Sequence, residues 1–149
     1  MNTAQLEGTS ARDTAGLARP RRIEVSHATG DQYLIAARDH AILVDQPLAD
    51  GGDDAACTPV ELMVGALASC VAFYAGRYLV RHGLDRDRLR VRADYTMAAD
   101  RPPRIASVVI GIDVPGLPPD RRRALLAVAS HCTVHNTLQQ PPSVAISLA

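Results

Sequence analysis

The residues of this chain best suited to chemistry are its cysteines. The stretch "HCTVHNTL" places Cys132 between His131 and His135, and the stretch "TPVELMVGALASC" ends at Cys70. Two thiols that meet in a fold can hold a metal ion, form a structural bridge or exchange electrons as a redox pair. The third cysteine, Cys57, stands in a polar loop, where we expect an incidental role.

Zinc is the first alternative for these thiols. Cys70 and Cys132, with the two histidines beside Cys132, could together supply four nitrogen and sulfur ligands. The spacing is unlike the common paired-ligand patterns, because only Cys70 would come from a distant segment. We therefore expect no metal and keep a zinc site as an alternative.

A redox role requires that one of the thiols ionises, because the thiolate is the nucleophile. We expect Cys70 about three turns inside a helix, where that helix's own N-terminal charge gives little help. An outside cation must then lower its pKa, and arginine suits this because it stays ionised. We expect Cys132 near the C-terminal end of a helix, which disfavours a thiolate. Cys70 would attack, and Cys132 would resolve the sulfenic acid as a disulfide.

Composition excludes several classes of function. The chain has 149 residues, which suits one domain with a real core. Its 16 basic residues, all arginine, balance 16 acidic ones, so no overall charge attracts nucleic acid or an anionic membrane. One Phe, four Tyr and no Trp make a base-stacking surface improbable. Three cysteines are too few, and too odd in number, for a disulfide scaffold.

The chain ends and the apolar runs bear on its location. No uninterrupted apolar run approaches the roughly 18 residues of a membrane span. The first residues lack the apolar stretch of a secretory signal, so we expect a cytoplasmic protein. Residues 1–20 lack periodicity and are expected to form a flexible tail, followed by one folded domain over residues 21–149.

Hydrophobic patterning predicts the order β-β-β-α-β-β-α-β. Three short apolar runs, separated by turns at residues 30–31 and 38–39, predict an antiparallel meander. Alternating apolar residues predict two further strands around Val91 and Val108. A second helix is expected from Pro118 through Cys132, and "SVAISL" is expected to form a final strand.

The first helix has clear boundary signals. Thr58 can be its N-cap, Pro59 fits its first position, and Glu61 suits the partner position of a capping box. Gly83 is the expected stop. The segment between them is apolar around most of its circumference, so we expect a central helix covered by a sheet or by a partner subunit.

The two cysteine segments, with "HAILVDQPLADGGDDAACTPVEL" before the first, resemble the OsmC/Ohr family of thiol-dependent peroxidases. The resemblance covers about residues 23–148. It implies an α+β fold and an intertwined homodimer in which two long central helices are flanked by sheets. The family's active sites lie at the subunit interface.

The resemblance also implies an activity. Family members reduce organic hydroperoxides or hydrogen peroxide through a peroxidatic and a resolving cysteine. Carried over, Cys70 takes the peroxidatic position and Cys132 the resolving one. A small or lipoyl-type dithiol then reopens the disulfide. No metal, flavin or haem cofactor is implied.

The rest of the family's site matches less closely. The hydroperoxide-reducing branch has an acidic residue directly after the helix-opening proline, where this chain has Val60. Glu61 matches a glutamate of the wider family. Arg38 is the nearest candidate for the activating arginine, because "ATGDQ" occupies the usual place. His40 and His135 are candidate hydrogen-bond partners for the substrate.

These departures leave a second function open. A member of the same fold could bind a small apolar ligand at the dimer interface without catalysis. Arg77 and Arg81, toward the end of the first helix, are expected to be surface or interface charges and not the activating arginine.

Overall fold

The structure is a computed structural model that describes residues 21–148, so the tail expected at residues 1–20 lies outside the described part. The strands and helices follow one another as an α+β arrangement. Their order is β1 (Glu24–Thr29), β2 (Gln32–Ala37), β3 (His40–Val44), α1 (Pro59–Arg81), β4 (Arg90–Met97), β5 (Ile105–Asp113), α2 (Arg122–Ala129) and α3 (Thr133–Gln139). Short 3-10 turns at Leu48–Asp50 and Pro119–Arg121 complete the order.

Helix α1 is the spine of the molecule, and it begins where the sequence predicts. The Thr58 side chain accepts a hydrogen bond from the Glu61 N–H at 3.2 Å, and Glu61 accepts one from the Thr58 N–H at 2.8 Å. This confirms the capping box. The helix ends at Arg81, and Gly83 follows with φ +67°, a conformation that glycine adopts readily.

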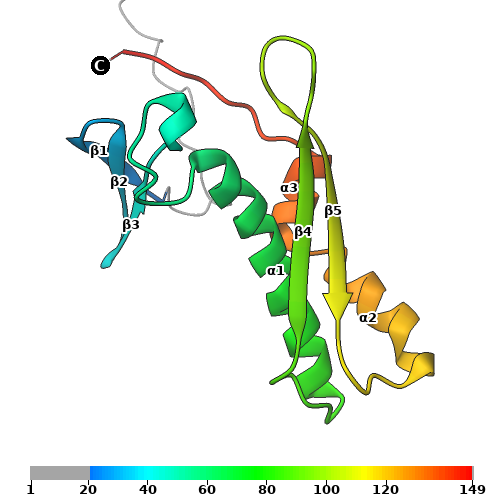
Figure 1. Cartoon of the computed structure of the whole chain (residues 1–149). Helices are drawn as coiled ribbons and strands as arrows, with labels where there is room; N and C mark the ends of the chain where they lie inside the picture. The colour runs from blue at the N-terminus through cyan, green and yellow to red at the C-terminus, as the bar shows by residue number, and fades with distance from the viewer. Residues whose placement is uncertain (1–20, 149) are drawn as a thin grey trace, which may run out of the picture.

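The other elements of the main body pack onto α1. The β4–β5 hairpin covers one side of it, while α2 and α3 contact it as well (Figure 1). Alternation along the hairpin turns apolar residues toward the helix, as the sequence predicts. The buried cluster that results contains Leu67, Val71, Ala75, Tyr78, Leu79, Leu125, Ala129 and Cys132.

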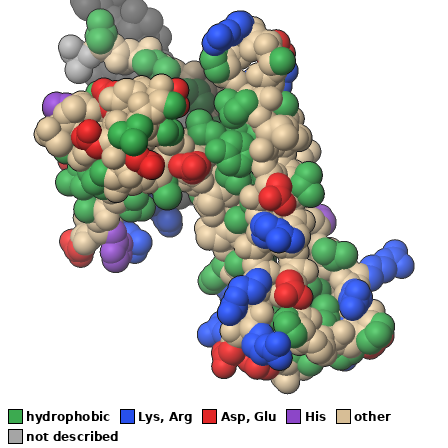
Figure 2. Space-filling model, viewed as in Figure 1, with side chains coloured by type: hydrophobic (Ala, Val, Ile, Leu, Met, Phe, Trp, Pro, Cys, Tyr) green, Lys and Arg blue, Asp and Glu red, His purple; other side chains and the backbone are tan. Residues whose placement is uncertain are grey.

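Strands β1–β3 form the predicted antiparallel meander with its turns at residues 30–31 and 38–39. This sheet lies beyond the N-terminal end of α1, set apart from the hairpin (Figure 1). In the space-filling view, hydrophobic side chains gather in the recess between the sheet and the hairpin (Figure 2). Several apolar side chains of the sheet remain exposed, namely Ile23, Val25, Tyr33, Leu34 and Ile42.

The structure corrects the predicted order at the C-terminal end. The expected second helix is two helices, because the backbone turns after Ala129 and resumes helical geometry only at Thr133. In this turn, the Ser130 hydroxyl donates to the Leu126 carbonyl oxygen at 2.7 Å, and the Cys132 backbone is extended. The expected strand in "SVAISL" is also not formed, since residues 143–148 have no strand partner among the described residues.

Within residues 21–148, α1 alone is long and apolar enough to span a membrane by length and composition. Core helices of proteins without a membrane segment pass the same test. Its contacts with β4, α2 and α3 make α1 the core helix of this fold.

Candidate functional site

The fold brings the two predicted redox cysteines together. Cys70 lies on α1 and is half-buried, and it packs against the buried cluster that contains Cys132. The contact between α1 and α3 makes them neighbours despite their separation in sequence. Both are free thiols. The arrangement therefore offers one partly accessible sulfur next to one enclosed sulfur.

Cys132 occupies a different electrostatic position from the one expected. It is not at a helix C-terminus but is the N-cap of α3, where its Sγ accepts a hydrogen bond from the His135 N–H at 3.4 Å. Its side chain is 0% exposed. Burial raises the pKa of the Cys132 thiol, the His135 N–H lowers it, and the adjacent Cys70 raises it again. The net effect is a raised pKa, because burial is the largest of these influences. Burial therefore favours the protonated form of Cys132.

Two hydrogen bonds hold the segment around Cys132. The hydroxyls of Tyr74 on α1 and Thr133 on α3 lie 3.1 Å apart. Tyr74 is one helical turn after Cys70, and Thr133 directly follows Cys132. The Nδ1 atom of His135 bonds the carbonyl oxygen of Ser130 across the turn that contains Cys132. The first bond ties α3 to α1, and the second closes the turn.

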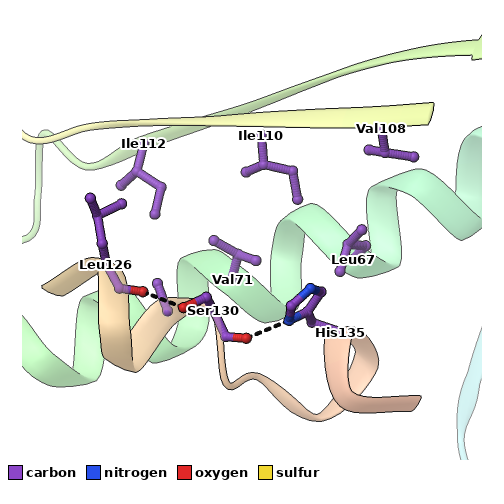
Figure 3. Close-up of a pocket in the computed structure, with 9 residues that line it drawn as sticks. Leu67, Val71, Val108, Ile110, Ile112, Leu126, Ser130 and His135 are labelled. Atoms are coloured by element: carbon purple, nitrogen blue, oxygen red, sulfur yellow. Dashed lines mark hydrogen bonds between the residues drawn. The ribbon is translucent and has the colours of Figure 1, made fainter. Parts of the chain in front are cut away.

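An apolar pocket of about 240 Å³ opens beside the cysteine segments. Figure 3 shows strand β5 forming one wall and α1 another, with α2 and α3 closing the remaining side. His135 stands at one end of this pocket, and it and Ser130 are the polar residues of the lining (Figure 3). The lining residues are Leu67, Val71, Val108, Ile110, Ile112, Leu126, Ala129, Ser130 and His135.

The other sequence-predicted residues lie elsewhere in the single chain. Glu61 caps the N-terminus of α1, nine positions before Cys70, which is about 13.5 Å along a helix axis. Arg38 is exposed in the turn between β2 and β3, with φ +56°. His40 is exposed at the start of β3. The sheet that carries Arg38 and His40 is not among the elements packed on α1.

No arginine of residues 21–148 hydrogen-bonds to Cys70 or Cys132. Residues 21–148 thus supply the two sulfurs without an arginine hydrogen-bonded to either of them. In the same range, no group of three or more His, Cys, Asp or Glu side chains is placed to hold a metal ion. The zinc alternative therefore gains no support from the geometry.

Sequence reasoning missed the residues that frame the cysteines. Tyr74, Ser130 and Thr133 are not among the predicted site residues. The helical spacing held a usable signal, because Tyr74 is one turn after Cys70 and Thr133 directly follows Cys132. Once the two cysteines are paired, these neighbours must lie close together as well.

The comparison with protein families agrees with this arrangement. A family model of OsmC-like proteins matches residues 51–147, a range that contains α1, the β4–β5 hairpin and both cysteines. The chain belongs to the OsmC-like protein family. Among curated proteins, no match was found.

Solved structures share the fold at low sequence identity. A Psychrobacter arcticus protein assigned to osmotic stress and detoxification responses has a TM-score of 0.73 and 22% identity, covering 82% of this chain and 90% of its own. The Legionella pneumophila organic hydroperoxide resistance protein OsmC has a TM-score of 0.62 and 16% identity, covering 79% and 89%. The Bacillus subtilis organic hydroperoxide resistance protein OhrB has a TM-score of 0.58 and 14% identity, covering 80% and 92%. These OsmC-like structures confirm the predicted fold class.

Proposed function

We propose that this OsmC-like protein is a thiol-dependent peroxidase that reduces organic hydroperoxides or hydrogen peroxide with Cys70 and Cys132. The observation that carries the proposal is the pairing of a half-buried free thiol with a fully buried one. Two of the similar structures are named organic hydroperoxide resistance proteins, which supports the same substrate class.

The chemistry follows from the unequal exposure of the two sulfurs. The Cys70 thiolate attacks the distal peroxide oxygen, the O–O bond breaks, and the alkoxide leaves as an alcohol after taking a proton. Cys70 is then a sulfenic acid. The Cys132 sulfur attacks the Cys70 sulfur, so that an S–S bond forms and water leaves. A dithiol of the small or lipoyl type then reduces this disulfide by exchange and becomes a disulfide itself.

The apolar pocket suits the organic part of such a peroxide. Its walls are mostly aliphatic, and its volume of about 240 Å³ accommodates a short alkyl or aryl group. His135 at the pocket end can hydrogen-bond the peroxide oxygens through its Nε2, whose contact with the Gln139 amide nitrogen is long, at 3.4 Å. An organic hydroperoxide therefore fits the pocket better than hydrogen peroxide alone.

The missing cation points to a homodimer. Arg38 is carried by a sheet whose apolar side chains are exposed and which stands apart from the helices of its own chain. The exposed side of α1 also carries Met63 and Phe73. Apolar surface of this extent favours association with a second copy. We expect Arg38 of that copy, with His40 beside it, to approach Cys70 and stabilise its thiolate form.

The deciding experiment is disulfide mapping. The reduced protein is treated with one equivalent of cumene hydroperoxide, digested without reductant and analysed by mass spectrometry. The expected product is a Cys70–Cys132 disulfide, with one cumyl alcohol released per disulfide. The Cys132→Ser variant should instead accumulate a Cys70 sulfenic acid, which dimedone traps.

Cys57 supplies the matched control. It is an exposed cysteine in the same chain, so nonspecific oxidation would reach it first. The Cys57→Ser variant should form the Cys70–Cys132 disulfide at the wild-type rate. Free thiols at Cys70 and Cys132 after the peroxide is consumed would disprove the proposal.

A second function rests on the same pocket. Val60 replaces the acidic residue of the hydroperoxide-reducing branch, and the pocket can hold an apolar ligand without any redox step. In that case the Cys70→Ser variant keeps full ligand binding and full cellular function. A redox enzyme loses its peroxide-dependent function with the same substitution. A cytoplasmic location suits either function, because reduced thiols persist there.

A further inference from the structure

A second pocket of about 110 Å³ lies where α1 packs against α2, closer to the C-terminal end of α1 than Cys70 is. We call it the arginine crevice. Its lining consists of Tyr74, Arg77, Tyr78 and Arg81 from α1 and Val128 from α2. Four of these five residues, Arg77, Tyr78, Arg81 and Val128, have no role in the proposed peroxidase chemistry.

The two arginines of the crevice lack a counter-charge. Arg77 and Arg81 stand four positions apart, an arrangement in which like charges on a helix repel. No carboxylate of the described residues lies within salt-bridge distance of either guanidinium. The negative partial charge at the C-terminal end of α1 partly balances the charge of Arg81. Arg77 lies one turn earlier, where this effect is weaker. Its guanidinium carbon lies 5.7 Å from the Phe73 ring centre instead.

Tyr78 gives an independent indication of a ligand. Its hydroxyl is buried, and it has no hydrogen-bond partner among the described residues. Its ring stacks on His82 with the centres 4.1 Å apart, which holds it as a wall of the crevice. The hydroxyl of Tyr74, by contrast, is already paired with Thr133. A buried hydroxyl without a partner is costly, and a ligand in the crevice can pair with it when the Tyr78 ring moves.

We propose that the arginine crevice binds a small oxyanion, namely a carboxylate or a phosphate group. Two guanidiniums offer paired N–H donors that suit such a group, and the Tyr78 hydroxyl can donate a third bond after a small ring movement. The volume is below the roughly 300 Å³ of sites for whole organic ligands, so it suits an ion or a terminal group.

This site is separate from the thiol chemistry. Arg77 is seven positions after Cys70 on α1, which is about 10.5 Å along the helix axis. An anion in the crevice therefore does not touch the Cys70 sulfur. Loss of peroxidase activity would leave the anion site intact, and loss of anion binding would leave the disulfide chemistry intact.

Inorganic phosphate is the probe for the test. Two of the four tyrosines, Tyr74 and Tyr78, line the crevice and the chain has no tryptophan, so part of the tyrosine fluorescence comes from the crevice. At constant ionic strength, phosphate should change this fluorescence in a saturable way with millimolar or lower half-saturation. Arg77→Gln and Arg81→Gln should each weaken binding about tenfold or more, because each removes charge-assisted hydrogen bonds. Tyr78→Phe should weaken it less.

The matched control is Arg123→Gln, which removes an exposed arginine of α2 outside the crevice. It should bind phosphate like the wild type, and circular dichroism should show that every variant is folded. A linear fluorescence change, or equal weakening by Arg123→Gln, would overturn the proposal.

The same oxyanion chemistry could come from a carboxylate of a second copy. Sedimentation equilibrium distinguishes this source from a free anion. If the crevice takes a small anion, phosphate and Arg81→Gln leave the dimer dissociation constant unchanged. If both raise that constant in parallel, a partner carboxylate fills the crevice and the free-anion proposal fails.

Discussion

The Tyr74 hydroxyl on α1 lies 3.1 Å from Oγ1 of Thr133 on α3. This bond crosses the same helix contact that brings Cys70 next to Cys132. Cys132 is the N-cap of α3, directly before Thr133, so the bond fixes the helix end that carries the buried sulfur. Tyr74 therefore acts as a positioning residue for the cysteine pair.

Replacing Tyr74 with Phe should slow disulfide closure without slowing the first oxidation. The hydrogen bond is partly exposed, and such a bond contributes about 0.5–1 kcal/mol. The loss corresponds to a roughly two- to fivefold lower rate of Cys70–Cys132 closure. Stopped-flow measurement of sulfenic acid formation and decay separates the two steps. Thr133→Val completes a double-mutant cycle, and additive effects of the two substitutions would contradict the positioning role.

Cys132 should make the protein less stable at alkaline pH. Burial raises the pKa of its thiol above the ordinary value of 9.0. The unfolded chain loses this proton at lower pH than the folded protein, so stability is complete below about pH 9 and falls as pH rises toward the folded pKa. The melting temperature measured across pH 8–11 should show this decline. Cys132→Ala should decline less steeply, although removal of the buried sulfur costs about 1 kcal/mol at neutral pH.

The control for this prediction is Cys57→Ala, which removes an exposed thiol. Its melting temperature should follow the wild-type pH dependence, since Cys57 has the same solvent access before and after unfolding. Both variants retain every other ionisable side chain of the wild type. Parallel curves for Cys132→Ala and the wild type would contradict the assigned cause.

The sequence predicts the parts of this fold that depend on local chemistry. The capping box at Thr58 and Glu61 and the alternation along β4 and β5 both have local physical causes, and both are confirmed. The break between α2 and α3 was not predicted, because it depends on the side chains of Ser130 and His131, which bond the Ala127 carbonyl oxygen in place of the next helical N–H.

The remaining differences arise from surfaces that one chain leaves uncovered. Residues 143–148 carry a strand pattern, yet a strand needs a neighbour to accept its hydrogen bonds. Arg38 likewise lies on a sheet that does not pack on its own α1. The contact between the two cysteines could be predicted because both lie on elements that pack into the core around α1. The expected activating arginine could not be placed, because no arginine of the described part of the chain hydrogen-bonds to either thiol.

Asp45 should hold the loop that leads into α1. Its carboxylate is 1% exposed and accepts hydrogen bonds from the N–H groups of Gln46, Asp53 and Ala55 at 2.7, 3.1 and 3.0 Å. Asp45→Asn keeps the shape but turns one acceptor oxygen into an N–H donor facing other donors. We expect a lower melting temperature at neutral pH, measured by calorimetry.

The same carboxylate predicts an acid dependence. The backbone bond from Ala55, opposed by burial and aided by the bonds from Gln46 and Asp53, lowers the pKa of Asp45 from its ordinary value of 3.8. Its stabilisation is therefore present above pH 3.8 and is lost as pH falls through the folded pKa. Asp45→Asn should lose less stability than the wild type on acidification. Asp54→Asn changes an exposed carboxylate in the same loop. Its melting temperature should match that of the wild type at neutral and at acidic pH.

The uncovered segment at residues 143–148 should pair with the β1–β3 sheet of a second copy. Ile146 is 96% exposed and Leu148 102% exposed in the single chain, and a strand turns these two side chains to the same face. Burying an isoleucine contributes about 1.5–3 kcal/mol, so Ile146→Asp should weaken the dimer by about tenfold to a hundredfold or more. Ser147→Asp changes the opposite face and should have little effect. Sedimentation equilibrium measures both, and equal dissociation constants for the two variants would exclude strand pairing as the dimer contact.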